Sequence, residues 1–368
     1  MPTLVAYVSG HGFGHASRTI EVLNAIADRA PGVRILVRTE AAPWLFRITA
    51  RPGIALAAVA CDTGAVQIDS LHLDEVETIR RAERFMIDFD QRIEAEAAVL
   101  AEAGASLVIA DAPPLGIAAG RAVGCPTVLV GNFTWDWIYA AYPGGAAVAE
   151  TIGRVYAEAD LALRLPLHGG FATCRRIEDL PFVARRSRRD PAETRQALGL
   201  PHDRPLALVS FGGYGAAQMD VARLAHTPRY GIVMTDATPI DGHTLAALGP
   251  TGALLPLDVT AIYGRGFRYE DVVRAVNVVV SKPGYGIIAE CAANDTALLY
   301  TSRGHFAEYD VLVAGMPRYL RTRFVDQATL LAGRWAEDLD ALLGQPDPPE
   351  RADVSGADVA AERLLGMM

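Results

Sequence analysis

The 368-residue sequence is poor in lysine and cysteine and contains no long apolar run. Lys282 is the only lysine, and the four cysteines are scattered without a Cys-x-x-Cys pair. This pattern does not indicate a metal site or a disulfide framework. The sequence contains no run of about 18 apolar residues, the length that would predict a membrane span. No basic segment precedes the first apolar run, as one would in a signal peptide. We therefore expect a cytoplasmic protein without a metal site.

Several motifs of well-known enzyme classes are also missing. The sequence has no Gly-x-Ser-x-Gly of serine hydrolases and no Gly-x-x-x-x-Gly-Lys-Ser/Thr phosphate loop. The glycines between Gly10 and Gly14 have the wrong spacing for a dinucleotide-binding fingerprint. The net charge of −9 disfavours nucleic-acid binding. The one basic cluster, residues 185–189, is interpreted as a solvated linker, with a phosphate or acidic-lipid contact as the alternative.

The order of apolar runs predicts an α/β protein with two domains. Strand and helix patterns alternate from residue 4 to residue 165, and a second alternating series begins near residue 206. Such alternation is typical of a doubly wound parallel sheet covered by helices on both faces. We expect an amino-terminal domain at 1–166, a linker at 167–204, a second domain at 205–345, and a tail at 346–368 that packs back on the first domain.

Polar side chains gather after the predicted strands of the first half. Because parallel strands end at one edge of a sheet, and ligands bind at that edge, this set predicts a site. The set consists of His11, His15, Asp62, Asp111, Asn132 and Asp136.

His15 is the candidate general base of this set. It begins a predicted helix, and Asp111 ends a predicted strand, so the carboxylate would fix the imidazole tautomer if the two meet. The alternative is that both residues only cap helices. His11 has the same ambiguity, and either histidine remains a candidate base. Trp135, Asp136 and Trp137 are expected to line an acceptor pocket, or, as the equal alternative, to pack in the core.

The second half contains two further glycine loops. Gly212 and Gly213 follow the first strand of that half, and Gly284 and Gly286 stand where a later strand meets a helix. Backbone amides at such a helix start favour a phosphate, and Lys282 would add a positive charge. Glu290, six residues after Gly284, would accept ribose hydroxyls. The alternative is a tight turn with an exposed glutamate.

Taken in order and spacing, these loops resemble those of GT-B glycosyltransferases. The likeness is strongest to the glycosyltransferase-like amino-terminal half of plant L-arabinokinases, and more distant to the N-acetylglucosaminyltransferases that form lipid II. It covers roughly residues 3 to 340, and the kinase half is expected to be absent because the chain ends too soon. The matching stretches are 10–18, 62–67, 132–139, 164–166, 211–213, 284–290 and 306–308.

The resemblance implies a GT-B architecture, in which two Rossmann-like domains face a central cleft. It implies that Phe267 and Arg268 flank the nucleobase and that Glu308 reads hydroxyls of the donor sugar. His15 matches the histidine of the first glycine loop, whereas His11 replaces a glycine. The expected donor-binding set is Gly12, Gly14, Gly212, Gly213, Phe267, Arg268, Ser281, Lys282, Gly284, Tyr285, Gly286, Glu290 and Glu308. The expected acceptor-side set is His11, Asp62, Asn132, Trp135 and Asp136.

The function expected from this likeness is sugar transfer from a nucleotide sugar, with UDP favoured, to a hydroxyl of a small-molecule acceptor. No cofactor or metal is expected, because backbone amides and the helix dipole would stabilise the leaving diphosphate. Two alternatives stay open: a non-catalytic module that binds nucleotide sugars, and a hydrolase or epimerase that acts on them. The oligomeric state, the donor sugar, the acceptor and the stereochemical outcome are not predicted.

Overall fold

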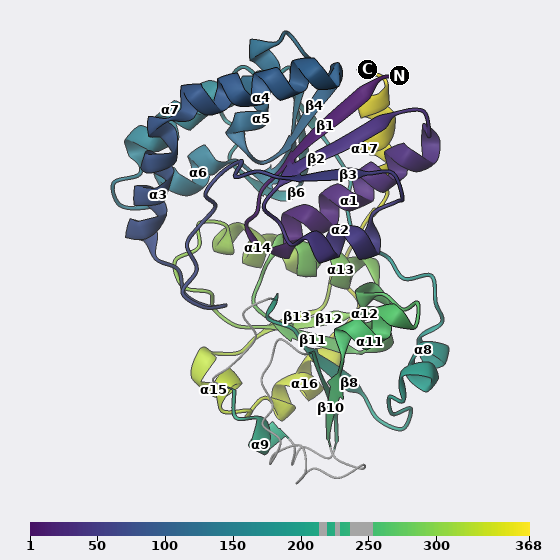
Figure 1. Ribbon diagram of the computed structural model, residues 1–368. Helices are drawn as coiled ribbons and strands as arrows, with labels where there is room; N and C mark the ends of the chain where they lie inside the picture. The colour runs from purple at the N-terminus through teal and green to yellow at the C-terminus, as the bar shows by residue number, and fades with distance from the viewer. Residues whose placement is uncertain (213–218, 225–228, 236–252) are drawn as a thin grey trace.

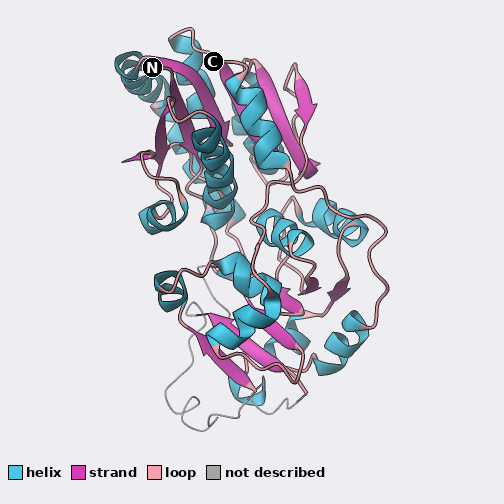
Figure 2. Ribbon diagram, turned by 90° about the vertical axis from the view of Figure 1, so that its right-hand side faces the viewer, coloured by secondary structure: helices cyan, strands magenta, loops and turns pink. Residues whose placement is uncertain are grey.

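The computed structural model describes residues 1–212, 219–224, 229–235 and 253–368. The chain forms two lobes, with the amino-terminal strands in one and the later strands in the other (Figure 1). A view from the side shows the same division, with both chain ends in the first lobe (Figure 2). Gly213, one of the expected donor-binding residues, lies outside the described residues.

The described residues of the first lobe form a seven-stranded sheet in the order β3-β2-β1-β4-β5-β6-β7. Every pair in this sheet is parallel. Its inner strands are almost entirely apolar because helices cover both faces. The strands are β1 (Thr3–Val8), β2 (Arg34–Thr39), β3 (Ala55–Ala58), β4 (Ala105–Asp111), β5 (Thr127–Phe133), β6 (Leu161–Gly169) and β7 (Ile177–Asp179).

Side chains of β1 alternate between two cores. Leu4, Ala6 and Val8 pack with the apolar stripe of the first helix, whereas Val5 and Tyr7 pack on the opposite face. This alternation fixes the register of the sheet, because a slip by one residue would exchange the faces. The helices of this lobe are α1 (Gly12–Arg29), α2 (Pro43–Thr49), α3 (Glu75–Ile87), α4 (Phe89–Ala103), α5 (Pro114–Ala122), α6 (Trp135–Ala140) and α7 (Ala146–Tyr156).

In the described part of the second lobe, six parallel strands follow the order β10-β9-β8-β11-β12-β13. They are β8 (Leu206–Val209), β9 (Gly231–Thr235), β10 (Leu254–Leu257), β11 (Val278–Ser281), β12 (Ala297–Tyr300) and β13 (Thr322–Phe324). The helices from residue 191 onward are α8 (Pro191–Leu198), α9 (Val221–Leu224), α11 (Val259–Gly264), α12 (Tyr269–Ala275), α13 (Tyr285–Ala293), α14 (Tyr309–Gly315), the 3-10 turn η2 (Met316–Arg318), α15 (Gln327–Leu331), α16 (Ala336–Leu343) and α17 (Gly356–Leu365).

The elements near the expected domain limits run differently from the sequence prediction. β6 continues to Gly169 and β7 joins the same sheet, so the first sheet extends past residue 166. Near the end of the second sheet, a 3-10 turn ends at Arg318 and the last strand, β13, begins at Thr322. The last helix, α17, packs on α1, with Ala360, Ala361 and Leu364 in the core of the first lobe (Figure 1). The domain limits themselves stay a prediction.

Both sheets reverse their strand order at one point, and the two reversals position the site. The first lies between β1 and β4, where Val8 pairs with Asp111. The second lies between β8 and β11, where Val209 pairs with Val280. Ligands of doubly wound sheets bind at the carboxyl ends of the strands beside such reversals. The glycine loops at 10–14, 211–213 and 281–286 all follow these strands.

None of the described helices combines the length and the apolar character needed to cross a membrane.

Candidate active site

His15 and Asp111 meet at the first reversal of strand order. α1 begins at Gly12, whose φ of +70° favours glycine, and this turn brings His15 into the first turn of the helix. Asp111 is the last residue of β4, and only 2% of it is exposed. The Nδ1 of His15 lies 2.8 Å from the Oδ1 of Asp111. The Nε2 of His15 is therefore the nitrogen that remains for a substrate.

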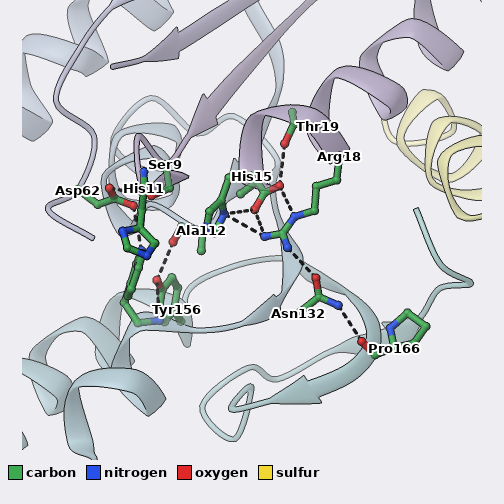
Figure 3. Close-up of polar contacts among 12 residues, drawn as sticks. Ser9, His11, His15, Arg18, Thr19, Asp62, Ala112, Asn132, Tyr156 and Pro166 are labelled. Atoms are coloured by element: carbon green, nitrogen blue, oxygen red, sulfur yellow. Dashed lines mark hydrogen bonds and ion pairs between the residues drawn. The ribbon is translucent and has the colours of Figure 1, made fainter. Parts of the chain in front are cut away.

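Asp111 is the centre of a buried polar network that also includes Arg18, Thr19 and Asn132 (Figure 3). The Nε of Arg18 donates to Asp111 Oδ2 at 2.7 Å, and the hydroxyl of Thr19 donates to the same oxygen at 2.7 Å. The Nη2 of Arg18 contacts Asp111 Oδ1. Both carboxylate oxygens are thus held by at least two partners. We call these four residues, together with His15, the Asp111 network.

Two charges decide the ionisation of Asp111. Burial alone would raise the pKa of its carboxyl, but the positive charge of Arg18, followed by that of His15, holds the pKa well below its usual range. Asp111 is therefore a permanent carboxylate at neutral pH, which can orient the imidazole and balance its charge.

Both ends of the Asn132 side-chain amide are hydrogen-bonded within the protein. Its Oδ1 accepts from Nη1 of Arg18 at 2.6 Å, and its Nδ2 donates to the carbonyl of Pro166 at 2.7 Å. Asn132 therefore holds the guanidinium of Arg18 at Nη1, whereas Asp111 contacts Nε and Nη2. The expected acceptor role of Asn132 stays a prediction.

His11 lies close to His15 but in a different environment. The ring centroids are 6.4 Å apart, and Nδ1 of His11 accepts from the backbone N–H of Ala65 at 3.4 Å. Burial, together with the charge of His15, lowers the pKa of His11 to about 3. An imidazole with so low a pKa is a poor base near neutral pH. Of the two candidate bases, the geometry favours His15.

Trp135 and Asp62 form a second layer beneath the histidines. The indole of Trp135 is 1% exposed and stacks on His15 with centroids 6.2 Å apart, and its Nε1 donates to Asp62 Oδ2 at 2.9 Å. The other Asp62 oxygen accepts from the hydroxyl of Ser9 at 3.0 Å. Trp135 is therefore packed in the core, and it supports the imidazole from behind.

Asp136 and Trp137 do not join the other candidates. The Oδ2 of Asp136 accepts from the hydroxyl of Thr173 at 3.2 Å. Trp137 covers the backbone of Gly169, where a Cβ would come within 2.3 Å of its ring. The core-packing alternative fits Trp137, and no contact of Asp136 reaches a histidine among the described residues.

The helix starts of the two lobes face each other. A Cβ placed on Gly286 would lie 3.7 Å from the Cα of Gly14, so α1 and α13 approach closely at their first turns. Neither helix carries an acidic residue in its first turn or a side-chain cap hydrogen bond. Gly284 precedes α13, and a Cβ there would meet open space. Free amides and two helix dipoles converge here, which favours an anion.

Gly212 adds a backbone constraint on the same edge of the second sheet. Its φ is +72°, a conformation that favours glycine. Beside it, the Ser281 hydroxyl donates to the carbonyl of Ser210. These contacts tie the end of β11 to the loop after β8.

Glu290 is buried and paired with Arg185. The Nε of Arg185 donates to Glu290 Oε1 at 2.6 Å, and the Nη2 of Arg185 contacts the same oxygen. Burial raises the pKa of Glu290, and the charge of Arg185 opposes that rise. Both contacts of Arg185 are to Oε1, and the expected contact of Glu290 with ribose hydroxyls stays a prediction. The alternative of an exposed glutamate is wrong, because 6% of Glu290 is exposed.

The basic cluster at 185–189 is not a solvated linker throughout. The side chain of Arg185 is 12% exposed, and it holds Glu290. Ser187 is buried, and its hydroxyl donates to Asp271 at 2.6 Å. The charge run therefore fastens the chain to α12 and α13, which sequence composition does not reveal.

Lys282, Arg303 and Glu308 form a cluster of charged side chains that follow β11 and β12, and the expected role of Glu308 at the donor sugar stays a prediction. The Nη1 of Arg303 donates to Glu308 Oε1 at 3.0 Å. Burial, together with the positive charge of Arg303, lowers the pKa of Lys282 to about 7. The charges of Arg303 and Lys282 are also among the causes that lower the His11 pKa, so the cluster faces the first lobe.

Phe267 and Arg268 lie at the start of α12. The ring of Phe267 is 8% exposed, and the guanidinium of Arg189 lies 4.5 Å from its centroid. The backbone N–H of Arg268 donates to Asp271 Oδ2 at 2.8 Å. The ring face is thus covered by Arg189, and the expected nucleobase contact of this segment stays a prediction.

Within the described ranges, no group of three or more His, Cys, Asp or Glu side chains is arranged to hold a metal ion.

Comparisons with known proteins place this geometry in a known fold. No family model matches the chain. The chain is 26% identical over 366 residues to L-arabinokinase of Arabidopsis thaliana, a match that covers 97% of the chain and 34% of the relative. The chain therefore spans about a third of the length of this curated relative.

The solved structures that resemble the chain are glycosyltransferases and related proteins. The glycotransferase of kitacinnamycin has a TM-score of 0.64 at 17% identity, with 100% of this chain and 97% of that chain covered. UGT2 of Phytolacca americana, complexed with UDP-2fluoro-glucose and pterostilbene, has a TM-score of 0.61 at 13% identity over 99% of this chain and 94% of that one. MurG of Acinetobacter baumannii has a TM-score of 0.59 at 12% identity, with both chains covered completely. The chain has the GT-B glycosyltransferase fold, as expected from its glycine loops.

Proposed function

We propose that this protein is a glycosyltransferase that moves a sugar from a nucleotide sugar, with UDP favoured, to an acceptor hydroxyl without a metal ion. The observation that carries the proposal is the close approach of two different sites. His15, oriented by Asp111, stands at the start of α1, and the start of α13 faces it across the contact between Gly14 and Gly286. A base and an anion site are thus within reach of one donor.

His15 acts as the general base in this proposal. Asp111 holds Nδ1, so Nε2 accepts the proton of the acceptor hydroxyl. The acceptor oxygen then forms a bond to the anomeric carbon, while the bond between that carbon and the diphosphate oxygen breaks. The electron pair leaves with the nucleoside diphosphate. Asp111 remains ionised and balances the imidazolium.

The second lobe stabilises the leaving group. The amides at the start of α13 and its dipole oppose the charge that grows on the diphosphate. Glu290 Oε2 accepts from a ribose hydroxyl in this arrangement. The UDP-2fluoro-glucose complex of UGT2, on the same fold, supports a UDP sugar as the donor.

A contact between the lobes helps to exclude water from the donor. The segment between β3 and α3 reaches the second lobe, where Leu71 packs in the core around β8 and β11. The hydroxyl of Ser70 donates to the carbonyl of Phe211 at 3.0 Å, next to the glycine loop at 212. Water exclusion matters because water would otherwise hydrolyse the donor.

The test is calorimetric titration with UDP, dTDP and GDP, followed by assays of the corresponding sugar nucleotides with a panel of hydroxylated acceptors. Binding of one nucleotide in the micromolar to millimolar range, and acceptor-dependent release of the nucleoside diphosphate in the presence of EDTA, are expected. Absence of binding by all three nucleotides contradicts the proposal. Release of free sugar at the same rate without any acceptor shows a hydrolase instead.

A further inference from the structure

Three buried polar atoms at the carboxyl ends of β11 and β12 have no hydrogen-bond partner among the described residues. They are the hydroxyls of Tyr285 and Thr301 and the Nε of Arg303. The two strands pair in parallel, with Ser281 opposite Tyr300, so these three residues start from one edge of the sheet. Buried polar groups are nearly always partnered, and the exceptions in a binding site indicate a polar ligand.

Arg303 is held in a fixed orientation. Its side chain is 7% exposed, its guanidinium carbon lies 3.5 Å from the ring centroid of Phe306, and its Nη1 donates to Glu308. The Nε edge of the guanidinium is therefore left to a ligand. A planar guanidinium with a free edge matches a carboxylate better than it matches a neutral hydroxyl.

The charges of the cluster do not balance. Lys282 and Arg303 are cations, Glu308 is the anion paired with Arg303, and Lys282 makes no hydrogen bond or ion pair among the described residues. Asp69, whose charge also acts on Lys282, already receives contacts from the backbone and ring of His72. With Lys282 protonated, the cluster therefore carries one more positive than negative charge beside Glu308.

We propose that the donor sugar carries a carboxylate, as in a uronic acid, and that Arg303 and Lys282 bind that carboxylate. This inference rests on the proposed function, because it assumes that a nucleotide sugar occupies the site. The sugar ring then lies between Glu308 and His15, and its remaining hydroxyls meet Tyr285 and Thr301.

A second anion besides the diphosphate fits the layout of the strands. The diphosphate has the free amides at the start of α13, which follow β11, whereas Arg303 follows the neighbouring strand β12. Because Arg303 follows a different strand, we assign it to the sugar and not to the diphosphate, and a ligand without an acceptor at this point would leave its Nε unpaired.

The test compares UDP-glucuronate, UDP-galacturonate, UDP-glucose and UDP by calorimetry on the full chain. We expect at least one uronate to bind about 10- to 100-fold more tightly than UDP-glucose, as a buried charged hydrogen bond would give. In Arg303→Gln this preference falls to about one, while UDP affinity changes little. Arg334→Gln, which removes an exposed arginine outside the site, is the matched control and keeps the full preference.

A second variant guards against loss of folding, since Arg303→Gln leaves Glu308 without its partner. Lys282→Met removes a side chain that has no hydrogen bond among the described residues, so its melting temperature stays at or above that of the parent. The preference of Lys282→Met for the uronate over UDP-glucose is also expected to fall.

Three results overturn the inference. If UDP-glucose binds as tightly as both uronates, the sugar carries no carboxylate. If both variants lose affinity for UDP and all its sugars by the same factor, the cluster belongs to the diphosphate. If UDP, dTDP and GDP all fail to bind, the proposed function itself is refuted, and this inference with it.

Discussion

The Asp111 network and the Arg303 cluster both contain buried charged side chains, but they differ in how their polar atoms are partnered. The Arg303 cluster consists of Lys282, Tyr285, Thr301, Arg303 and Glu308. In the network, each oxygen of Asp111 has at least two partners, and Asn132 holds Arg18 at Nη1. In the cluster, the Nε of Arg303 and the hydroxyls of Tyr285 and Thr301 have none among the described residues.

This difference separates two tasks. A network whose hydrogen bonds are satisfied is rigid before substrate arrives, which is what a general base needs. A group with unpaired atoms gains its partners only from a ligand, which gives specificity because the wrong ligand leaves those atoms unpaired. We therefore assign the chemistry to the first lobe and the selection of the donor to the second.

The largest expected effect comes from the base. His15→Gln is expected to lower transfer by about 10²- to 10⁴-fold, because proton transfer to a positioned base contributes that much. Donor affinity measured by calorimetry is expected to stay within about twofold of the parent, because the substitution leaves the α1 backbone and the donor-binding side chains of the second lobe unchanged. His202→Gln, at an exposed histidine, is the control with full activity. Undiminished transfer by His15→Gln would remove the assignment of the base.

The second effect concerns Asp111 and stability. Asp111→Asn is expected to lower the free energy of unfolding by about 3–5 kcal/mol at pH 6, because it leaves the buried Arg18 without its counter-charge. The pKa of Asp111 is lowered in the folded protein, so its contribution is full above the ordinary aspartate pKa of about 4 and is lost as pH falls further. Urea unfolding at pH 6 and pH 3 measures this difference. A gap between parent and variant that is as large at pH 3 as at pH 6 would contradict the charge argument.

The third effect sharpens the role of the cluster. The pKa of Lys282 is lowered to about 7 by burial and by Arg303, against the opposing charges of Glu308 and Asp69. An anionic donor binds the protonated amine, so affinity is expected to fall about eightfold between pH 6.5 and pH 8. Calorimetry with a UDP sugar at both pH values measures this change in affinity. The ligand adds no pH dependence of its own, because its diphosphate diester does not titrate in this range. The donor affinity of Lys282→Met is expected to be independent of pH over this range. A pH dependence that persists in Lys282→Met would show that another group causes it.

The smallest effect is expected at Glu21 on α1, outside both regions. Burial, together with the charge of Glu270, raises the pKa of Glu21 to about 7. A raised pKa contributes stability that is full below the ordinary glutamate pKa and is lost as pH rises through 7. Glu21→Gln is therefore expected to be more stable than the parent at pH 8 by about 1 kcal/mol, and no more stable at pH 5. Denaturant unfolding at both pH values decides it; an equal difference at pH 5 and pH 8 contradicts the ionisation of Glu21.

The sequence predicted the architecture and the contact between His15 and Asp111 because both follow from chain order. Apolar runs of strand length alternate with helical stripes, and residues that end parallel strands meet at one edge. Arg18 was missed, although it lies three residues after His15 on the same helix face, because a helical arginine is usually solvated.

Other side chains could not be placed from the sequence because their partners are distant in the chain. Arg185 pairs with a glutamate 105 residues away, so its run of charges looked like a solvated linker. Asp136 was expected at the site because it follows β5, but that strand extends to Phe133 and a helix begins at Trp135. Trp135 therefore faces the histidines, and Asp136 contacts Thr173 instead.

The most direct test of this division of tasks is one calorimetric titration of UDP-glucuronate into His15→Gln and Arg303→Gln side by side. The account predicts that His15→Gln binds the donor as the parent does and that Arg303→Gln loses about 10- to 100-fold in affinity. Loss of donor affinity in His15→Gln with full affinity in Arg303→Gln would contradict it.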